Sequence, residues 1–239
     1  MIPRDSVRKV SACTDRILRC RLTDETEKKR DRKMKEPCEY SEICGIILAG
    51  GKSTRMGTDK ADLVLNGKTF LEIQAEKLRH IGISDICLSG YSAPLPYTRC
   101  VADIRPGLGP LGGICSCFVS CSCRYALVLS VDTPLISEDS LKDLLCKHLN
   151  AECDATILTC DGKMEPLIAV YNTDTVSILK ELLAESKNSA PPFDPALRQC
   201  HKKLSVRAFL RRLNCQFHEF QGDKRELLNC NTYGDYLSL

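Results

Sequence analysis

From residue 43 onward, short and continuously apolar runs alternate with longer amphipathic stretches. Continuous apolar runs are typical of strands buried on both faces, whereas apolar positions three and four residues apart indicate helices. The pattern predicts strands at 43–48, 85–89, 125–131, 155–158 and 167–171, and helices at 70–81, 111–120, 138–149 and 173–185. Strands and helices in this order predict an α/β domain with a three-layer, Rossmann-like architecture and a mostly parallel central sheet.

The last part of the domain begins with a proline-rich stretch. Residues 189–195 contain three prolines, which remove backbone donors and hold the preceding residues away from the helical region, so we predict a loop there. Beyond it we expect a helix near 205–213, a short strand at 215–220 and a turn at 229–237.

Residues 1–40 differ from the rest of the chain. Their charges alternate in sign and they offer few apolar side chains to a core. We therefore predict a charged N-terminal extension that is flexible or a solvated helix, with a functional basic arm as the alternative. Residues 41–239 then form a single domain.

Composition narrows the class of protein. The 239 residues are 43% hydrophobic, which is enough for a full core, and the net charge of +3 does not predict a nucleic-acid partner. Sixteen cysteines are spread through the chain, so we interpret them as reduced thiols rather than a disulfide framework. No apolar signal region and no run of about 18 apolar residues occur, so we expect a cytoplasmic protein without a membrane partner.

The loop after the first predicted strand, in the stretch IILAGGKSTRMGTDK, combines glycines with cations. Gly50 and Gly51 would let the backbone amides approach phosphate oxygens, and Lys52, Arg55 and Lys60 could neutralise a triphosphate. The loop therefore indicates a phosphate-binding site at the carboxyl end of a strand. The alternative is a tight turn whose cations face water.

Two common nucleotide-binding motifs do not fit this loop. Gly51-Lys52-Ser53 matches only the end of a Walker A sequence, because Ile46 stands where the first glycine would be. The dinucleotide fingerprint G-x-G-x-x-G is also missing from the sequence.

The segment LAGGKSTRMGTDK resembles the signature of the molybdenum cofactor guanylyltransferases, members of a broad nucleotidyltransferase group. Three further blocks follow in the family's order: GLGPLGGI at 107–114, SVDTPL at 130–135 and NCNT at 229–232. The resemblance extends over about residues 43–237. It implies a nucleotidyltransferase fold and the transfer of GMP from GTP to molybdenum-molybdopterin, which yields the guanine dinucleotide cofactor and pyrophosphate.

The resemblance also implies roles for individual residues. It assigns GTP binding in the first loop to Leu48, Ala49, Gly50, Gly51 and Lys60. It suggests that Lys60 reaches the phosphates as a catalytic group and that Arg55 stabilises charge on the transferring phosphorus. The alternative for Arg55 is a structural ion pair with Asp59 or Asp62.

Asp132 directly follows an apolar strand and should emerge at the carboxyl edge of the sheet. The resemblance implies that Asp132 contacts the nucleotide, acts in catalysis and binds Mg²⁺, a cation that prefers carboxylates, phosphate oxygens and water. A helix N-cap is the alternative. Asn229 or Asn231 is a further candidate for holding the metal or phosphates, with turn capping as the alternative, and Tyr233 replaces the proline usual in the family.

Recognition of guanine is implied for a second set of residues. The Gly109-Pro110-Leu111 turn matches the family's guanylyltransferase block, which differs in the related cytidylyltransferases. Asp103 matches an acidic position before this block. Ser89 stands where the family has an asparagine, and its hydroxyl can both donate and accept, although it is shorter than an amide.

The acceptor is not identified by the residues themselves. The alternatives are a CTP-dependent molybdopterin cytidylyltransferase, a sugar-phosphate nucleotidyltransferase and a non-catalytic cofactor carrier of the same fold. The implied partners are GTP and molybdenum-molybdopterin, with molybdoenzymes or their chaperones as further candidates.

The segment Cys115–Cys123 has the spacing C-x-C-x₃-C-x-C, which matches none of the usual zinc motifs. On a helix, Cys117 and Cys121 would share a face while the other two point elsewhere. We interpret the cysteines as small thiols that pack on the sheet, with a structural metal as the alternative. The four histidines show no ligand spacing, and we assign none to catalysis.

Overall fold

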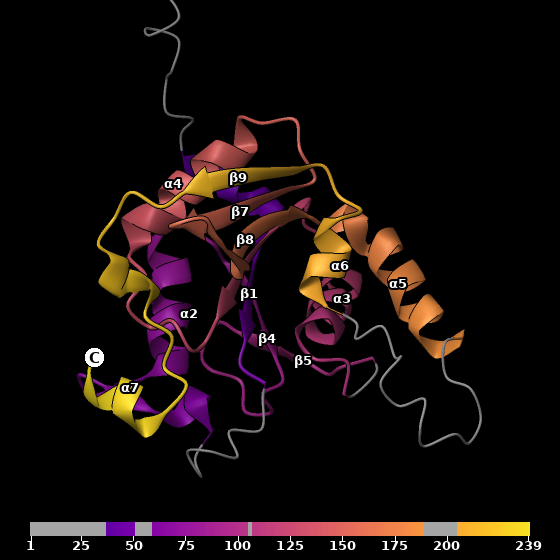
Figure 1. Cartoon of the computed structure of the whole chain (residues 1–239). Coiled ribbons are helices and arrows are strands. Elements are labelled where there is room, and N and C mark those ends of the chain that lie inside the picture. Colours follow the sequence, from indigo (N-terminus) through magenta and orange to yellow (C-terminus); the bar gives the residue numbers. More distant parts are fainter. Residues whose placement is uncertain (1–36, 51–58, 105–106, 189–204) are drawn as a thin grey trace, which may run out of the picture. The chain divides into compact units, whose positions relative to one another are not determined.

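A computed structural model of the chain describes residues 37–50, 59–104, 107–188 and 205–239 (Figure 1). The chain divides into two compact units, Met1–Glu39 and Tyr40–Leu239. A short 3-10 helix, η1 (Pro37–Glu42), spans the division. Most of the predicted N-terminal extension, the loop at 189–195, Gly51 and Arg55 lie outside the described residues.

A seven-stranded sheet forms the centre of the second unit, and its strands lie in the order β5-β4-β1-β6-β8-β7-β9. Their bounds are β1 Ile43–Leu48, β4 Asp85–Ser89, β5 Arg99–Val101, β6 Tyr125–Ser130, β7 Ala155–Cys160, β8 Lys163–Asn172 and β9 Cys215–Glu219. β8 pairs antiparallel with β6 and β7, and the remaining pairs are parallel. The mostly parallel sheet predicted from the sequence is therefore confirmed.

Helices cover both faces of the sheet and produce the expected three layers (Figure 1). One face carries α2 (Phe70–His80) and α4 (Glu138–Leu149). The other carries α3 (Pro110–Ser120), α5 (Val176–Asn188) and α6 (Val206–Leu210). All six residues of β1 are buried, because this strand lies inside the sheet and apolar side chains pack on both of its faces.

Short elements connect these layers. They are η2 (Lys60–Asp62), the hairpin strands β2 (Val64–Leu65) and β3 (Lys68–Thr69), η3 (Thr173–Thr175), η5 (Lys224–Leu227) and α7 (Tyr233–Leu237). Among the described residues, no helix has the length and apolar character needed to cross a membrane.

The predicted elements match the structure closely, and the differences have local causes. β2, β3 and β5 were not predicted, because strands of two or three residues are too short to show a periodic pattern. The reversed direction of β8 was not predicted either. Asp161-Gly162, with φ of 51° and 71°, makes the tight turn that joins β7 to β8, and this dipeptide is a strong hairpin signal.

Candidate active site

The carboxyl ends of β1, β4 and β6 meet at one edge of the sheet. The amides of Ala49 and Gly50 both donate to the carbonyl of Ser89, at 2.9 and 3.1 Å, and the amide of Val131 donates to the carbonyl of Leu48 at 3.1 Å. These bonds extend the parallel pairing by one or two residues beyond the strands. They hold the start of the glycine-rich loop at the edge where open α/β sheets bind ligands.

Glycine is required where the first loop passes the end of β4. A Cβ atom on Gly90 would lie 2.3 Å from Cα of Gly50, and Gly90 has φ +78°. A Cβ atom on Gly50 would in turn lie 2.9 Å from Cα of Gly90. Gly50 therefore serves close backbone packing, whatever it also contributes to phosphate binding.

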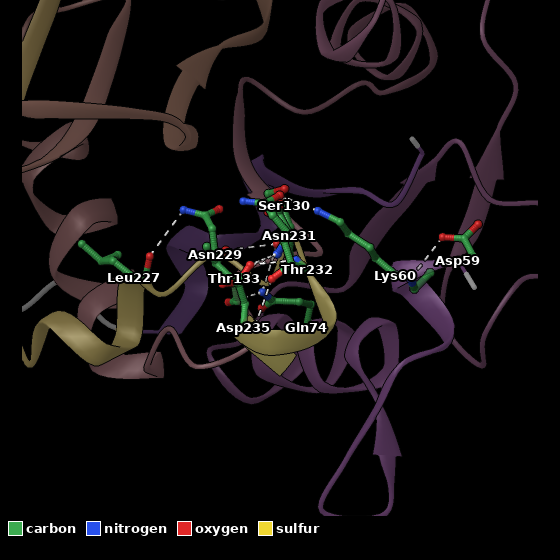
Figure 2. Close-up of polar contacts among 12 residues, drawn as sticks. Asp59, Lys60, Gln74, Ser130, Thr133, Leu227, Asn229, Asn231, Thr232 and Asp235 are labelled. Atoms are coloured by element: carbon green, nitrogen blue, oxygen red, sulfur yellow. Dashed lines mark hydrogen bonds and ion pairs between the residues drawn. The ribbon is translucent and has the colours of Figure 1, made fainter. Parts of the chain in front are cut away.

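Lys60, Asp132 and Asn231 converge at this edge from three separate segments. Lys60 Nζ lies 3.4 Å from Asp132 Oδ2 and donates to Asn231 Oδ1 at 2.6 Å. Figure 2 shows the lysine side chain extending from η2 toward Asn231. Lys60 and Asp132 are 20% and 22% exposed, so the pair is partly shielded but open to a ligand.

Side chains of helix α2 hold the turn that carries Asp132 by hydrogen bonds to its carbonyl groups. The amide nitrogen of the fully buried Gln74 donates to the carbonyls of Ser130 and Thr133, at 3.1 and 2.8 Å. Lys77 donates to the carbonyl of Pro134, and burial lowers the pKa of Lys77 to about 8. Gln74 was not predicted to support the site, because nothing in its local pattern separates it from an ordinary helix residue.

The structure shows which residues cap the helices next to the site. Asp132 does not cap α4, because the N-cap of that helix is Ser137. Thr232 caps α7 through a capping box with Asp235, so capping of this helix is not the role of Asn231. Asn229 donates to the carbonyl of Leu227 at 3.4 Å.

The C-terminal segment is bound directly to the Asp132 turn. The amide of Cys230 donates to the carbonyl of Asp132 at 2.8 Å, and Tyr236 donates to the carbonyl of Val64 at 2.7 Å. The segment therefore closes one side of the site and sets the position of Asn231.

The predicted guanine-binding residues lie around the start of α3. Gly109 precedes this helix with φ 64°, and Pro110 occupies its first turn, where the missing N–H is tolerated. Leu111 is buried in the core beneath. Ser89 is 4% exposed, and its hydroxyl faces Gly113, where an added Cβ would lie 2.2 Å away. Its contact with the nucleotide stays a prediction.

Asp103 combines burial with a missing partner. Its Oδ1 atom is buried and has no hydrogen bond within the described part of the chain. The next residue is held by a hydrogen bond of 2.9 Å from the amide of Ile104 to the hydroxyl of Ser116 in α3. A buried carboxylate oxygen without a donor is unfavourable unless a ligand supplies one.

A second acidic group influences the site from β8. Burial raises the pKa of Glu165, and the negative charge of Asp132 acts in the same direction. Glu165 was not among the residues that the sequence predicted to act in catalysis. The structure shows that the two carboxyl groups are electrostatically coupled, which depends on the pairing of β6 with β8.

Comparison with known proteins shows the family of this chain. The family model described as a MobA-like NTP transferase domain matches residues 45–213, well over half of the chain. This chain belongs to that family. The matched range contains Lys60 and Asp132, and it ends before the C-terminal segment that provides Asn231.

Named relatives of this MobA-like protein are of similar length. A Geobacillus protein named probable molybdenum cofactor guanylyltransferase is 31% identical over 67% of this chain and 84% of its own. One from Methanocaldococcus jannaschii, with the same name, is 30% identical over 80% of this chain and 94% of its own. Among solved structures, molybdopterin-guanine dinucleotide biosynthesis protein A from Archaeoglobus fulgidus has a TM-score of 0.63 at 21% identity, covering 82% of this chain and 95% of its own, which shows the shared fold.

Proposed function

We propose that this protein is a molybdenum cofactor guanylyltransferase. It transfers GMP from GTP to molybdenum-molybdopterin and releases pyrophosphate. The proposal rests on family membership and on relatives that carry this name. The observation that carries it is the convergence of Lys60 and Asp132 at the carboxyl edge of the sheet, beside the start of the glycine-rich loop.

In this reaction the terminal phosphate of the pterin attacks the α-phosphorus of GTP, and the bond to the pyrophosphate breaks. The attacking phosphate is already ionised near neutral pH, so the protein needs no general base. Its task is to position the reactants and to neutralise charge. Lys60 neutralises the phosphates, and Arg55, which lies outside the described residues, stabilises charge on the transferring group.

The oxygen donors at the site suit Mg²⁺. Asp132 offers a partly exposed carboxylate, and burial together with this negative charge raises the pKa of Glu165, which adds a second carboxyl group. Asn229 and Asn231 carry amide oxygens. Hard oxygen ligands in small number, with phosphates and water completing the shell, are typical of magnesium in proteins. When bound, the ion would draw charge from the phosphate oxygens and favour departure of the pyrophosphate. We propose Asp132 as its principal protein ligand.

The choice of base is assigned to Asp103. The Watson–Crick edge of guanine presents two adjacent N–H donors, whereas cytosine presents one donor beside an acceptor. A carboxylate can accept from both donors of guanine, and the partnerless Oδ1 of Asp103 has this capacity. A ligand that leaves a buried polar atom unpaired is strongly disfavoured, so CTP should be a poor substrate.

The decisive experiment measures pyrophosphate release by the purified protein with molybdenum-molybdopterin, Mg²⁺ and either GTP or CTP. The expected result is release with GTP and the dinucleotide form of the cofactor as product. Preference for CTP would indicate a cytidylyltransferase, and activity only with a sugar phosphate would indicate a different acceptor. Tight GTP binding without pyrophosphate release would indicate a carrier. Asp103→Asn, which removes the double acceptor, should reduce the preference for GTP over CTP.

We also propose that the protein acts in the cytoplasm and delivers its product to molybdoenzymes or their chaperones. The twelve cysteines whose side chains the structure describes are free thiols, which suits a reducing compartment. Expression with a fluorescent tag would test the location.

A further inference from the structure

The C-terminal segment contacts the stretch that begins at Lys60 at two separate points. Asn231 accepts a hydrogen bond from Lys60 Nζ at 2.6 Å. The hydroxyl of Tyr236 donates to the carbonyl of Val64 at 2.7 Å, and Val64 lies four residues after Lys60. Two hydrogen bonds therefore join the same two stretches of chain, one at the backbone and one at the end of the lysine side chain.

The short helix η2 does not fix the lysine by itself. It spans only Lys60–Asp62, Ala61 is its buried residue, and the amide of Leu63 donates to the Lys60 carbonyl at 3.3 Å. Short 3-10 helices have poorer hydrogen-bond geometry than α-helices. The hairpin that follows has only two residues in each of its strands, β2 and β3. The position of Lys60 therefore depends on contacts from outside its own stretch.

Asn231 is held at the start of α7 by Asp235. The carboxylate of Asp235 accepts from the amides of Asn231 and Thr232, at 2.9 and 2.7 Å, and Figure 2 shows these residues together beside Lys60. The hydrogen bonds from these amides lower the pKa of Asp235, so its side chain is ionised at neutral pH. Helix α7 thus sets the backbone from which the Asn231 side chain extends.

The ring of Tyr236 is packed, which directs its hydroxyl toward Val64. Its centroid lies 6.2 Å from that of Phe70, the fully buried first residue of α2. Tyr236 is half-buried. Tyr233, in the same helix, is 63% exposed, and its hydroxyl forms no hydrogen bond in the described part of the chain. The two tyrosines of α7 therefore differ in what their hydroxyl groups do.

These contacts form a closed circuit around the lysine. It runs from Lys60 along the backbone to Val64 and crosses to Tyr236. It returns along α7 to Asn231, whose amide oxygen accepts from the ammonium group. Lysine carries three N–H donors, so the contacts with Asn231 and Asp132 leave one for a phosphate oxygen. Ordering a long, flexible side chain costs entropy, and a side chain that is ordered in advance avoids this cost when the ligand binds.

We propose that Tyr236 is a positioning residue that holds Lys60 ready for the phosphates of the nucleotide. It acts through the Val64 carbonyl and Asn231, and it is assigned no contact with the substrate. The inference rests on the proposed function, because that function makes Lys60 the group that neutralises the phosphates of GTP.

The test compares Tyr236→Phe with the matched control Tyr233→Phe in the full chain. Each change removes one hydroxyl from α7, but only the first removes a hydrogen bond of the described structure. Trace acetylation with acetic anhydride, followed by mass spectrometry, measures how freely each lysine reacts. In Tyr236→Phe, the reactivity of Lys60 relative to Lys142 should rise at least about twofold, because the circuit opens more often. In Tyr233→Phe it should match the parent.

A second background separates positioning from a general loss of stability. Asn231→Ala removes the acceptor of the ammonium group, so adding Tyr236→Phe to it should cause no further rise in Lys60 reactivity. A merely structural role of Tyr236 would raise the reactivity equally in both backgrounds. In titration calorimetry, Tyr236→Phe should bind GTP about three- to tenfold more weakly than the parent, the range expected for one lost hydrogen bond. Tyr233→Phe should bind GTP as the parent does.

Equal Lys60 reactivity in Tyr236→Phe and the parent would overturn the proposal. Additive effects of Tyr236→Phe and Asn231→Ala would do the same. The labelling needs neither nucleotide nor pterin. A rise in Lys60 reactivity in Tyr236→Phe, with no GTP binding by the parent, would support the positioning role and contradict the guanylyltransferase proposal, so the two failures can be told apart.

Discussion

Replacing Gln74 with methionine tests how far the turn that carries Asp132, the proposed Mg²⁺ ligand, depends on helix α2. The side chain of Gln74 is fully buried, and its amide nitrogen is the donor to the carbonyls of Ser130 and Thr133, which flank Asp132. Methionine has a similar length and no branch, so it should fill the same space without donating. The change therefore removes two hydrogen bonds without creating a large cavity.

The magnitude follows from what each carbonyl retains. The Ser130 carbonyl keeps a hydrogen bond of 3.2 Å from the Thr133 hydroxyl, and the Thr133 carbonyl keeps a longer one of 3.4 Å from the amide of Ile136, so the principal loss is at the Thr133 carbonyl. A buried group left with no partner at all costs about 1–3 kcal/mol, which is the upper bound for this carbonyl. Part of this is offset, because Oε1 of Gln74 is itself buried and has no partner among the described residues. We expect a loss of about 1–2 kcal/mol in the free energy of unfolding.

The same change should loosen Asp132. Groups that orient a metal ligand typically contribute about 10–100-fold to metal affinity, so the Mg²⁺ concentration for half-maximal turnover should rise by at least about tenfold. Turnover at saturating Mg²⁺ should recover most of the parent value, since every reacting group is still present.

The assay combines urea unfolding with a Mg²⁺ titration of pyrophosphate release. Gln216→Met is the control, because Gln216 lies on β9 and also has a buried Oε1 without a partner in the described structure. It should leave the Mg²⁺ dependence unchanged. A Gln74→Met protein with the parent's Mg²⁺ dependence would refute the role of Gln74, as would a loss of turnover that Mg²⁺ cannot restore.

Three further predictions concern other parts of the domain. Asp132→Asn should lower turnover by orders of magnitude with little change in melting temperature, because asparagine keeps the size of the side chain but removes the charge that recruits Mg²⁺. Near-normal turnover of this variant at limiting Mg²⁺ would show that Asp132 is not part of the site. Gly90→Ala should lower the free energy of unfolding by more than about 1 kcal/mol and weaken GTP binding, because the added Cβ would lie 2.3 Å from Cα of Gly50. Gly67→Ala is the control, because φ is also positive there but no atom lies within 4 Å of the added Cβ. Calorimetry should show a smaller loss of stability in this variant and unchanged GTP binding. Burial lowers the pKa of His148, so the imidazole binds a proton more readily in the unfolded chain, and the free energy of unfolding should fall as the pH drops below 6.5. In urea unfolding, the stability of His148→Gln should depend less on pH than that of the parent. The same pH dependence in both proteins would contradict this prediction.

The sequence alone determined the layers of this protein and the place of its glycine-rich loop. Strand β1 reads as a continuous apolar run because both faces are covered, and helix α4 spans the predicted residues 138–149 because its apolar spacing and its cap are local signals. The glycine-rich loop could likewise be placed at the carboxyl end of a strand, since the order of the elements decides that edge.

Tertiary structure alone decided which side chains meet. Lys60 and Asn231 are 171 positions apart, and no local pattern brings an ammonium group to an amide across that distance. Gln74 supports the turn that carries Asp132 because α2 lies beside the end of β6, and the thiols of Cys44 and Cys87 meet because β1 and β4 are neighbours in the sheet. Periodicity records which face of an element is buried, but only the packing of elements determines what that face contacts.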